Sequence, residues 1–316
     1  MNNKTISIIV PFLNEEENLP ILYQRIISVF ENIKEQLELV FIDDGSHDQS
    51  LKWVKLIAAE NSNVKYIKLS RNFGHQRAIT AGMNHCTGDA AIIIDADLQD
   101  PPEVIKDLIE KWKDGYEVVH AVRSKRNGEP LLKKILAHFF YRIMSQITEV
   151  EMKIDSGDFR IIDRKAINAL NMLPEQHRYM RGLASWIGFH QTTIEYIREA
   201  RYSGETKYPF SKSVTLALNA ITSFSGTPLR LIFYLGNLLC LLSLAIAIYL
   251  YITWFLIQNN PPIHAGTTYL TLAIFFVSGL QMLCMGILSQ YLRRVFDEIK
   301  NRPLYLIAET NCKERL

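Results

Sequence analysis

The first 125 residues of the chain alternate between two patterns of hydrophobic positions. Short apolar runs, typical of buried strands, are separated by stretches in which apolar side chains recur every three or four residues, as on one face of a helix. The first such stretch carries Leu19, Leu22, Ile26, Phe30 and Ile33. The predicted strands are Ile6–Val10, Leu39–Ile42, Val64–Leu69, Ala90–Ile94 and Glu117–Ala121. Strands that alternate with helices predict an α/β domain with a mostly parallel sheet covered by helices on both faces.

The pattern is less regular between residues 126 and 228. We expect a helix over Leu131–Ile147 and a turn at Gly157-Asp158, because glycine and aspartate are common in turns. Segment 211–225 places apolar residues on one helical face, namely Val214, Leu218, Ile221 and Phe224. Such a helix either lies in the plane of a membrane surface or packs on the preceding domain.

A long stretch near the C-terminus lacks charge. From Leu231 to Leu292 there is no Asp, Glu, Lys or Arg, and the run is broken once, at the turn-forming residues 258–262. Each flank exceeds the about 20 apolar residues that a bilayer-spanning helix needs. A buried core hairpin is the alternative, but soluble core helices rarely run so far without charge. The sequence therefore predicts a transmembrane hairpin of helices 229–257 and 267–292, joined by a loop at 258–266.

Positive charge is distributed unevenly around these spans. The connecting loop has no Lys or Arg, whereas the outer ends are flanked by Arg230, Arg293, Arg294, Lys300 and Arg302. Positively charged flanks stay in the cytoplasm. We therefore expect a multi-pass protein of the cell membrane with a cytoplasmic domain at 1–210, a juxtamembrane segment at 211–228 and a cytoplasmic tail at 293–316.

Composition excludes several classes of function. A net charge of +2 provides no basic field for nucleic acid. Neither a G-x-G-x-x-G fingerprint nor a P-loop is present, which argues against dinucleotide enzymes and standard NTPases. The four cysteines show no metal-ligand or disulfide spacing. The isolated histidines His47, His75, His85 and His264 are interpreted as surface or core residues.

Acidic residues follow the fourth predicted strand in the sequence IIIDADLQDPPE. On an extended chain, alternate residues face the same side, so Asp95, Asp97 and Gln99 would converge on one cation. Oxygen ligands of this kind suit Mg²⁺ or Mn²⁺. The alternative is a solvated acidic loop that caps the following helix.

Polar residues also follow the first two predicted strands. Asp43 and Asp44 come after the second strand, where nucleotide folds place the acids that bind base and ribose. Asn14 and Glu15 come after the first strand. They either take part in the same site or only cap the next helix.

Six motifs occur in order along nearly the whole chain: PFLNEEENLP, FIDDGSHD, RNFGHQRAITAG, DADLQDPPE, SGDFRIIDR and R-x-x-G-x-x-K-Y at 201–208. With these motifs the chain resembles glycosyltransferase family 2. Within that family it resembles the polyprenyl-phosphate glycosyltransferases, both bactoprenol glucosyltransferase-like and dolichol-phosphate mannosyltransferase-like. The resemblance implies a GT-A fold, a Rossmann-like domain with a divalent metal, Mg²⁺ or Mn²⁺. It also implies inverting transfer of one sugar from a nucleotide sugar to polyprenyl (undecaprenyl) phosphate, in a homo-oligomer, to supply cell-surface glycan modification.

The resemblance also implies roles for individual residues. The nucleoside pocket would be lined by Pro11, Asn14, Glu15 and Asp43, and the metal and diphosphate would be held by Asp95, Asp97 and Gln99. Asp158 would lie beside the anomeric carbon, either as a base or as an orienting group. The lipid phosphate would be held by Arg123, Arg126, Arg201 and Lys207. Each of these basic residues has an alternative role in an ordinary surface ion pair.

Three other functions are weighed against this one. A processive polysaccharide synthase would resemble its relatives in a Gln-x-x-Arg-Trp motif, which is absent. A catalytically silent membrane partner would not need the acidic motifs. A transporter would need charged residues in its spans. The SGDFR and ITSFSGTPLR motifs resemble the bactoprenol glucosyltransferases and favour UDP-glucose, while UDP-N-acetylglucosamine, UDP-galactose and GDP-mannose stay open.

Overall fold

The computed structural model describes residues 4–124, 156–176, 178–199 and 263–312, together with isolated positions between 229 and 252. The chain divides into two compact units. The first contains the sheet and takes in the chain from Arg302 onward, and the second contains helix α10 (Ile263–Ile299). The helix predicted at 131–147 and the segment 211–228 lie outside the described residues.

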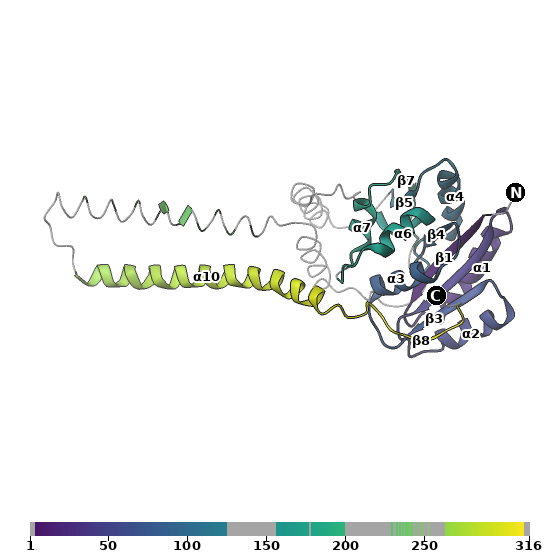
Figure 1. The fold of residues 1–316 in the computed structure, drawn as a ribbon, viewed down its shortest axis with the longest axis horizontal. Helices are drawn as coiled ribbons and strands as arrows, with labels where there is room; N and C mark the ends of the chain where they lie inside the picture. Colours follow the sequence, from purple (N-terminus) through teal and green to yellow (C-terminus); the bar gives the residue numbers. More distant parts are fainter. Residues whose placement is uncertain are drawn as a thin grey trace. The chain divides into compact units, whose positions relative to one another are not determined.

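The first unit is built on an eight-stranded sheet (Figure 1). Its strands are β1 (Thr5–Phe12), β2 (Gln36–Asp43), β3 (Val64–Leu69), β4 (Ala90–Ile93), β5 (Val118–Arg123), β6 (Ser156–Asp163), β7 (Gln191–Tyr196) and β8 (Ile307–Thr310). They are ordered β7-β5-β6-β4-β1-β2-β3-β8. The neighbours β4-β1-β2-β3 are all parallel, whereas β6 is antiparallel to both β4 and β5.

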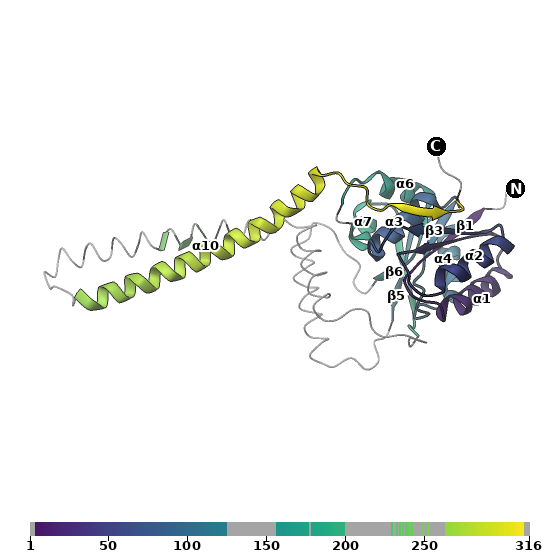
Figure 2. The same ribbon diagram turned by 90° about the horizontal axis from the view of Figure 1, so that it is seen from below.

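Helices cover both faces of the sheet (Figure 2). One face carries α1 (Asn18–Phe30), α2 (Ser50–Glu60), the short 3-10 helix η1 (Pro102–Val104) and α4 (Ile105–Lys113). The other carries α3 (His75–His85), α6 (Arg164–Met172) and α7 (Met180–Trp186). Helix α3 packs very closely, because a Cβ on Gly82 would lie 2.4 Å from the side chain of Ile9. The α/β architecture and all five predicted strands are confirmed.

The turn predicted at Gly157-Asp158 is wrong. Both residues belong to β6, which lies between β4 and β5. The strand buries Phe159 and Ile161 among the α1 and α4 side chains and Ile162 on the opposite face. Burial of both faces outweighs the turn preference of a glycine and an aspartate at one end of the strand.

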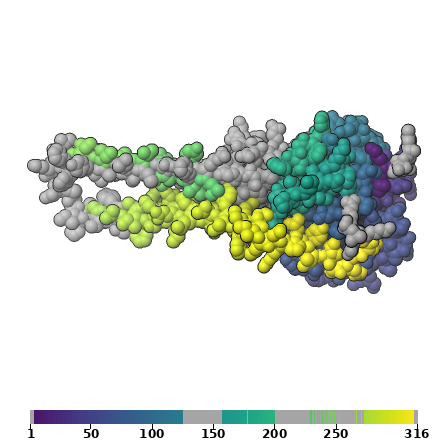
Figure 3. All heavy atoms as spheres, in the orientation of Figure 1, coloured from purple at the N-terminus to yellow at the C-terminus, as the bar shows by residue number. Residues whose placement is uncertain are grey.

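The C-terminal segment returns to the sheet as β8, a strand that the sequence analysis does not predict. β8 pairs antiparallel with β3 and is the last strand of the sheet on that side, and Asn311 extends the pairing with bonds to the backbone of Tyr66 and Val64. Before the strand, Tyr305 accepts a hydrogen bond of 2.9 Å from Asn84 on α3. In Figure 3 the yellow atoms of this segment lie on the surface of the unit, next to blue atoms.

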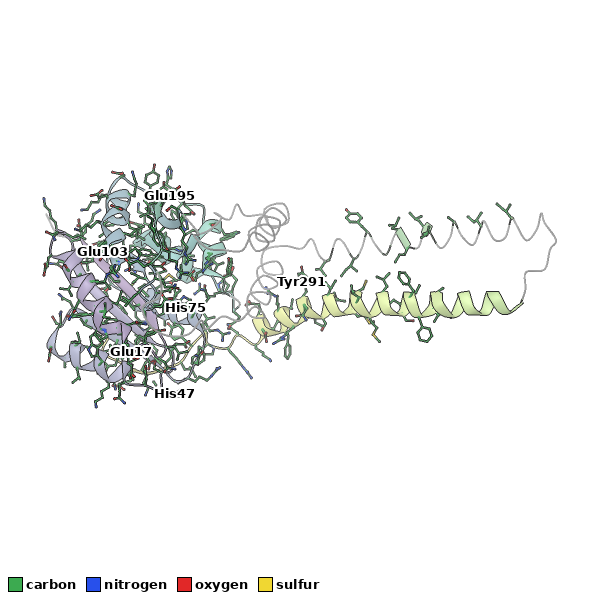
Figure 4. All side chains as sticks on the ribbon, turned by 180° about the vertical axis from the view of Figure 1, so that it is seen from behind. Glu17, His47, His75, Glu103, Glu195 and Tyr291 are labelled. Carbon is green, nitrogen blue, oxygen red and sulfur yellow. The ribbon has the colours of Figure 1, made fainter. Side chains whose placement is uncertain are left out.

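Helix α10 is long and apolar enough to span a membrane over Ala273–Ile299, and none of the most apolar window is buried within the protein. Its large hydrophobic side chains, such as Phe275 and Met282, are exposed. Side chains stand out along the helix in Figure 4, where Tyr291 is labelled. The predicted second span, 267–292, falls within α10, which begins earlier and ends later. The predicted first span, 229–257, falls largely outside the described residues.

Candidate functional site

The carboxyl ends of β1, β2 and β4 meet at one edge of the sheet because the three strands are parallel. β6 runs antiparallel to β4, with Arg160 opposite Ile93, so the first residues of β6 reach the same edge. We call this region the carboxyl edge. Open α/β sheets bind ligands outside the carboxyl ends of their strands. Every described residue that the sequence analysis places in a site comes to this edge.

Two loops at the carboxyl edge are fastened to each other by Asn14 and Glu15. The Asn14 N–H donates to Ser46 Oγ at 3.0 Å, and its Oδ1 accepts from the His47 N–H at 2.8 Å. The Glu15 N–H donates to Ser50 Oγ at 2.9 Å. Asn14 holds a left-handed φ of 53°, a strained conformation that this network stabilises.

Asp43 is fully buried at the end of β2. Its Oδ1 accepts the Ser46 N–H at 2.8 Å, but its Oδ2 is buried without a hydrogen-bond partner. Pro11 is buried in β1, in register with Ile42. A buried carboxylate oxygen without a donor costs free energy. Oδ2 of Asp43 is therefore suited to accept a hydrogen bond from a bound ligand.

Asp95, Asp97 and Gln99 lie in and beside a turn after β4, not on the extended chain that their spacing predicts. The chain turns because Leu98 has a left-handed φ of 60° and buries its side chain together with Ala96. The three polar residues remain half-buried. Asp97 Oδ1 accepts the Gln99 N–H at 3.1 Å, and Asp95 Oδ1 is buried without a hydrogen bond and faces His75 Nε2 at 3.3 Å.

These oxygen donors fit a hard divalent cation such as Mg²⁺ or Mn²⁺. The buried Oδ1 of Asp95 supports this, since it makes no hydrogen bond and a cation would join the His75 ring that faces it. Within the described residues, no three His, Cys, Asp or Glu side chains are grouped as a complete metal site. Mg²⁺ usually keeps several waters and is bound by one or two carboxylates together with substrate phosphates.

Asp158 is the centre of a dense polar cluster. It is 5 % exposed, and both of its oxygens face Arg181, with Nε to Oδ1 at 3.1 Å and Nη2 to Oδ2 at 3.3 Å. Gln76 Nε2 donates to Oδ2 at 3.2 Å. His75 Nε2 lies between two carboxylates, 3.3 Å from Asp95 Oδ1 and 3.5 Å from Asp158 Oδ2. Arg160, 1 % exposed, lies 3.5 Å from Asp158 Oδ1.

These neighbours set the charge of the cluster. Burial opposes ionisation of Asp158, but Arg181, His75 and Arg160 hold its pKa well below the usual value. Burial lowers the pKa of His75, but the charges of Asp95 and Asp158 outweigh it and raise the pKa to about 9. Burial raises the pKa of Asp95 to about 6, against the effect of His75. At neutral pH, Asp158 is thus ionised beside three cations.

Of the four basic residues predicted to hold a phosphate, the structure describes Arg123. Its Nε lies 3.4 Å from the Tyr196 hydroxyl, and a Cβ on Gly157 would lie 3.2 Å from its Nη2. The guanidinium is thus next to the residue before Asp158. Arg126, Arg201 and Lys207 lie outside the described residues.

Sequence reasoning missed four residues of the cluster: His75, Gln76, Arg160 and Arg181. Its interpretation of His75 as an isolated surface or core histidine is wrong, because the ring bridges Asp95 and Asp158. Figure 4 labels His75 within the α/β unit. One signal was available: RNFGHQ follows a parallel strand, β3, and so reaches the same edge of the sheet. For Arg181 no such signal exists.

Comparison with known proteins agrees with this architecture. The family model described as glycosyl transferase family 2 matches residues 7–170. YkcC of Bacillus subtilis, named as an uncharacterized glycosyltransferase, is 45 % identical over 304 residues, which are 96 % of this chain and 93 % of the relative. A prophage-derived bactoprenol glucosyl transferase of Shigella flexneri is 38 % identical over 310 residues, 97 % of this chain and 98 % of the relative. The chain belongs to glycosyl transferase family 2 and has its GT-A-like α/β fold.

Proposed function

We propose that this protein transfers a single sugar, glucose from UDP-glucose, to polyprenyl phosphate at the cytoplasmic face of the cell membrane. The observation that carries the proposal is the 38 % identity to a bactoprenol glucosyl transferase over 97 % of this chain, which includes the apolar helix α10. Transfer to another acceptor would not require a match through a helix of this kind. The same chemistry with another nucleotide sugar is the alternative.

The carboxyl edge supplies the parts that such a transfer needs. Asp43, with its free buried oxygen, suits the nucleoside, and the neighbouring Pro11, Asn14 and Glu15 would line the same pocket. Asp95, Asp97 and Gln99 would hold Mg²⁺ or Mn²⁺. Such a cation offsets the charge that develops on a diphosphate leaving group.

Asp158 acts by its charge in this proposal and not as a base. The acceptor, a phosphate monoester, has a second pKa of ~6 and is already ionised at neutral pH. Asp158, with its pKa held well below the usual range, is a weaker base than that phosphate. Its negative charge beside the anomeric carbon would stabilise the positive charge that develops there, with inversion of configuration. Arg123, with Arg126, Arg201 and Lys207, would hold the acceptor phosphate.

A labelling assay tests the function. Membranes that contain the protein are incubated with undecaprenyl phosphate and labelled UDP-glucose, UDP-N-acetylglucosamine, UDP-galactose or GDP-mannose. We expect label in the organic phase with UDP-glucose and not with membranes that lack the protein. Label from a different donor would correct the sugar, and no lipid-linked label from any donor would contradict the function.

The membrane topology is tested separately. We propose two spans, with residues 258–268 outside and both termini in the cytoplasm, since Lys and Arg flank only the outer ends of the apolar stretch. A membrane-impermeant thiol reagent added to intact cells should label Asn260→Cys and should not label Lys313→Cys. The reverse labelling would overturn the orientation.

A further inference from the structure

The side-chain amide of Gln76 joins two parts of the site. Its Nε2 donates to Asp158 Oδ2 at 3.2 Å, and its Oε1 accepts the backbone N–H of Met180 at 2.9 Å. A backbone N–H only donates and an ionised carboxylate only accepts. The two partners therefore determine which end of the amide faces each of them. No other neutral side chain of this length offers one donor and one acceptor in this arrangement.

The two partners of Gln76 belong to elements that are far apart in the sequence. Gln76 lies at the start of α3, Asp158 near the start of β6, and Met180 is the first residue of α7. The next residue of α7 is Arg181, which donates to both oxygens of Asp158. Gln76 thus touches the carboxylate directly and also holds the backbone that carries the partner cation of that carboxylate.

We propose that Gln76 is a positioning residue for glycosyl transfer, which fixes the carboxylate of Asp158 and the helix that carries Arg181 in one arrangement. This inference rests on the proposed function. Transfer depends on a charge held at the anomeric carbon, and a misplaced charge stabilises the transition state less. Loss of the Gln76 amide should therefore lower kcat and leave the binding of both substrates nearly unchanged.

Two substitutions separate positioning from simple anchoring of α7. In Gln76→Glu the carboxylate still accepts from the Met180 N–H but faces Asp158 with a like charge. In Gln76→Met both hydrogen bonds are lost and no charge is added. If contact with Asp158 is what matters, the Glu variant is impaired at least as strongly as the Met variant. If only the anchoring of α7 matters, the Glu variant keeps its activity.

Gln191 offers a matched control. Its amide also joins two elements at α7, with Nε2 donating to the Ala184 carbonyl at 2.7 Å and Oε1 at 3.0 Å from His120 Nε2. It lies away from Asp158, so Gln191→Met removes a bridging amide at the same helix without touching the carboxylate. We expect this variant to keep its kcat.

The experiment measures kcat, both KM values and Tm for the full-length wild type and the three variants, with UDP-glucose and undecaprenyl phosphate. We expect kcat to fall roughly ten- to a hundredfold in both Gln76 variants, as for the loss of a hydrogen bond to a charged group. Both KM values should change less than about threefold, and Tm should stay near that of Gln191→Met.

A wild-type kcat in Gln76→Glu would overturn the inference. So would a fall of kcat in Gln191→Met as large as the fall in the Gln76 variants. If Gln76→Glu does not fold, the comparison of Gln76→Met with Gln191→Met decides. A lower kcat in Gln76→Met than in Gln191→Met supports the inference, and an equal kcat in the two variants overturns it. An inactive wild type would contradict the proposed function itself, which distinguishes the two failures.

Discussion

Carboxylates are buried at the carboxyl edge of the sheet and at the opposite end, where the parallel strands begin and which we call the amino edge, and the two sites are built differently. At the amino edge, Glu38 on β2 accepts hydrogen bonds from Ser7, Lys65 and both the N–H and the hydroxyl of Thr87. At the carboxyl edge, Asp158 is surrounded by three cations and the amide of Gln76. Both carboxylates keep a lowered pKa although each is buried.

The difference lies in what surrounds each carboxylate. Glu38 and its partners Ser7, Lys65 and Thr87 have no left-handed backbone and no buried side-chain atom without a hydrogen-bond partner. The buried Nη1 of Arg164 lacks a partner, but the same guanidinium is held by the Cys86 and Gly88 carbonyls. At the carboxyl edge, Asn14 and Leu98 have left-handed backbone and Asp43 has a buried oxygen without a donor. Asp95 has a buried oxygen that faces the His75 ring without a hydrogen bond. Strain and unpaired polar atoms persist where a site is prepared for a ligand. We therefore assign a structural role to the amino edge and a functional role to the carboxyl edge.

The largest effect on transfer is expected from loss of the cation site. Asp97→Asn, or an excess of chelator, should lower transfer at least about a hundredfold, because a metal ion supplies several kcal/mol at ~1.4 kcal/mol per tenfold. The rate of lipid labelling checks this, with Mg²⁺ or Mn²⁺ added back after chelation. Asp107→Asn, on the exposed surface of α4, is the control and should remain active. Full activity of Asp97→Asn in excess chelator would contradict the proposal that transfer needs a bound cation.

A smaller effect is expected from the basic residues. Arg123→Ala and Arg201→Ala should each raise the polyprenyl phosphate concentration needed for half-maximal rate about ten- to a hundredfold, since a charge-assisted contact contributes roughly 1.5–3 kcal/mol. Slow hydrolysis of the donor by water should survive. Lys111→Ala, which breaks an exposed ion pair with Asp114, is the control. If the variants instead needed more UDP-glucose for half-maximal rate, these residues would be assigned to binding of the donor diphosphate.

The amino edge should affect stability and leave transfer unchanged. Because the pKa of Glu38 is lowered in the folded state, ionised Glu38 stabilises the protein above its unfolded pKa, and this contribution is lost as pH falls below 4.5. Glu38→Gln should lower the free energy of unfolding at neutral pH by about 1–3 kcal/mol. Urea unfolding of the full-length protein from pH 7 to pH 3 should show a weaker pH dependence in the variant. A loss of kcat in folded Glu38→Gln would contradict the structural role assigned to the amino edge.

The hydrophobic pattern was enough to predict the parallel part of the sheet. Strands such as Ile6–Val10 and Leu39–Ile42 are short, mostly apolar runs, so their positions are visible locally. The same pattern locates Asp43, Asp95 and Asp97, because Asp43 and Asp95 directly follow predicted strands and Asp97 comes two residues after Asp95. β8 was missed because it is short and only partly buried, with an alternation too brief to identify.

The cluster around Asp158 was not predictable in the same way. Gln76 is 82 positions from Asp158 and 104 from Met180, and only the packing of α3 and α7 on one face of the sheet brings them together. A local sequence pattern does not show which residues so far apart in the chain come into contact. The turn interpretation of Gly157-Asp158 failed for the same reason, since β6 is stabilised by pairing with β4 and β5.

The central claim is that a phosphate monoester of a lipid becomes a phosphodiester at the carboxyl edge. ³¹P NMR of purified protein with UDP-glucose and undecaprenyl phosphate tests it directly. We predict that one lipid monoester signal disappears and one diester signal appears for each UDP released, and that the product resists alkaline phosphatase. Release of UDP with the lipid monoester unchanged would contradict the account.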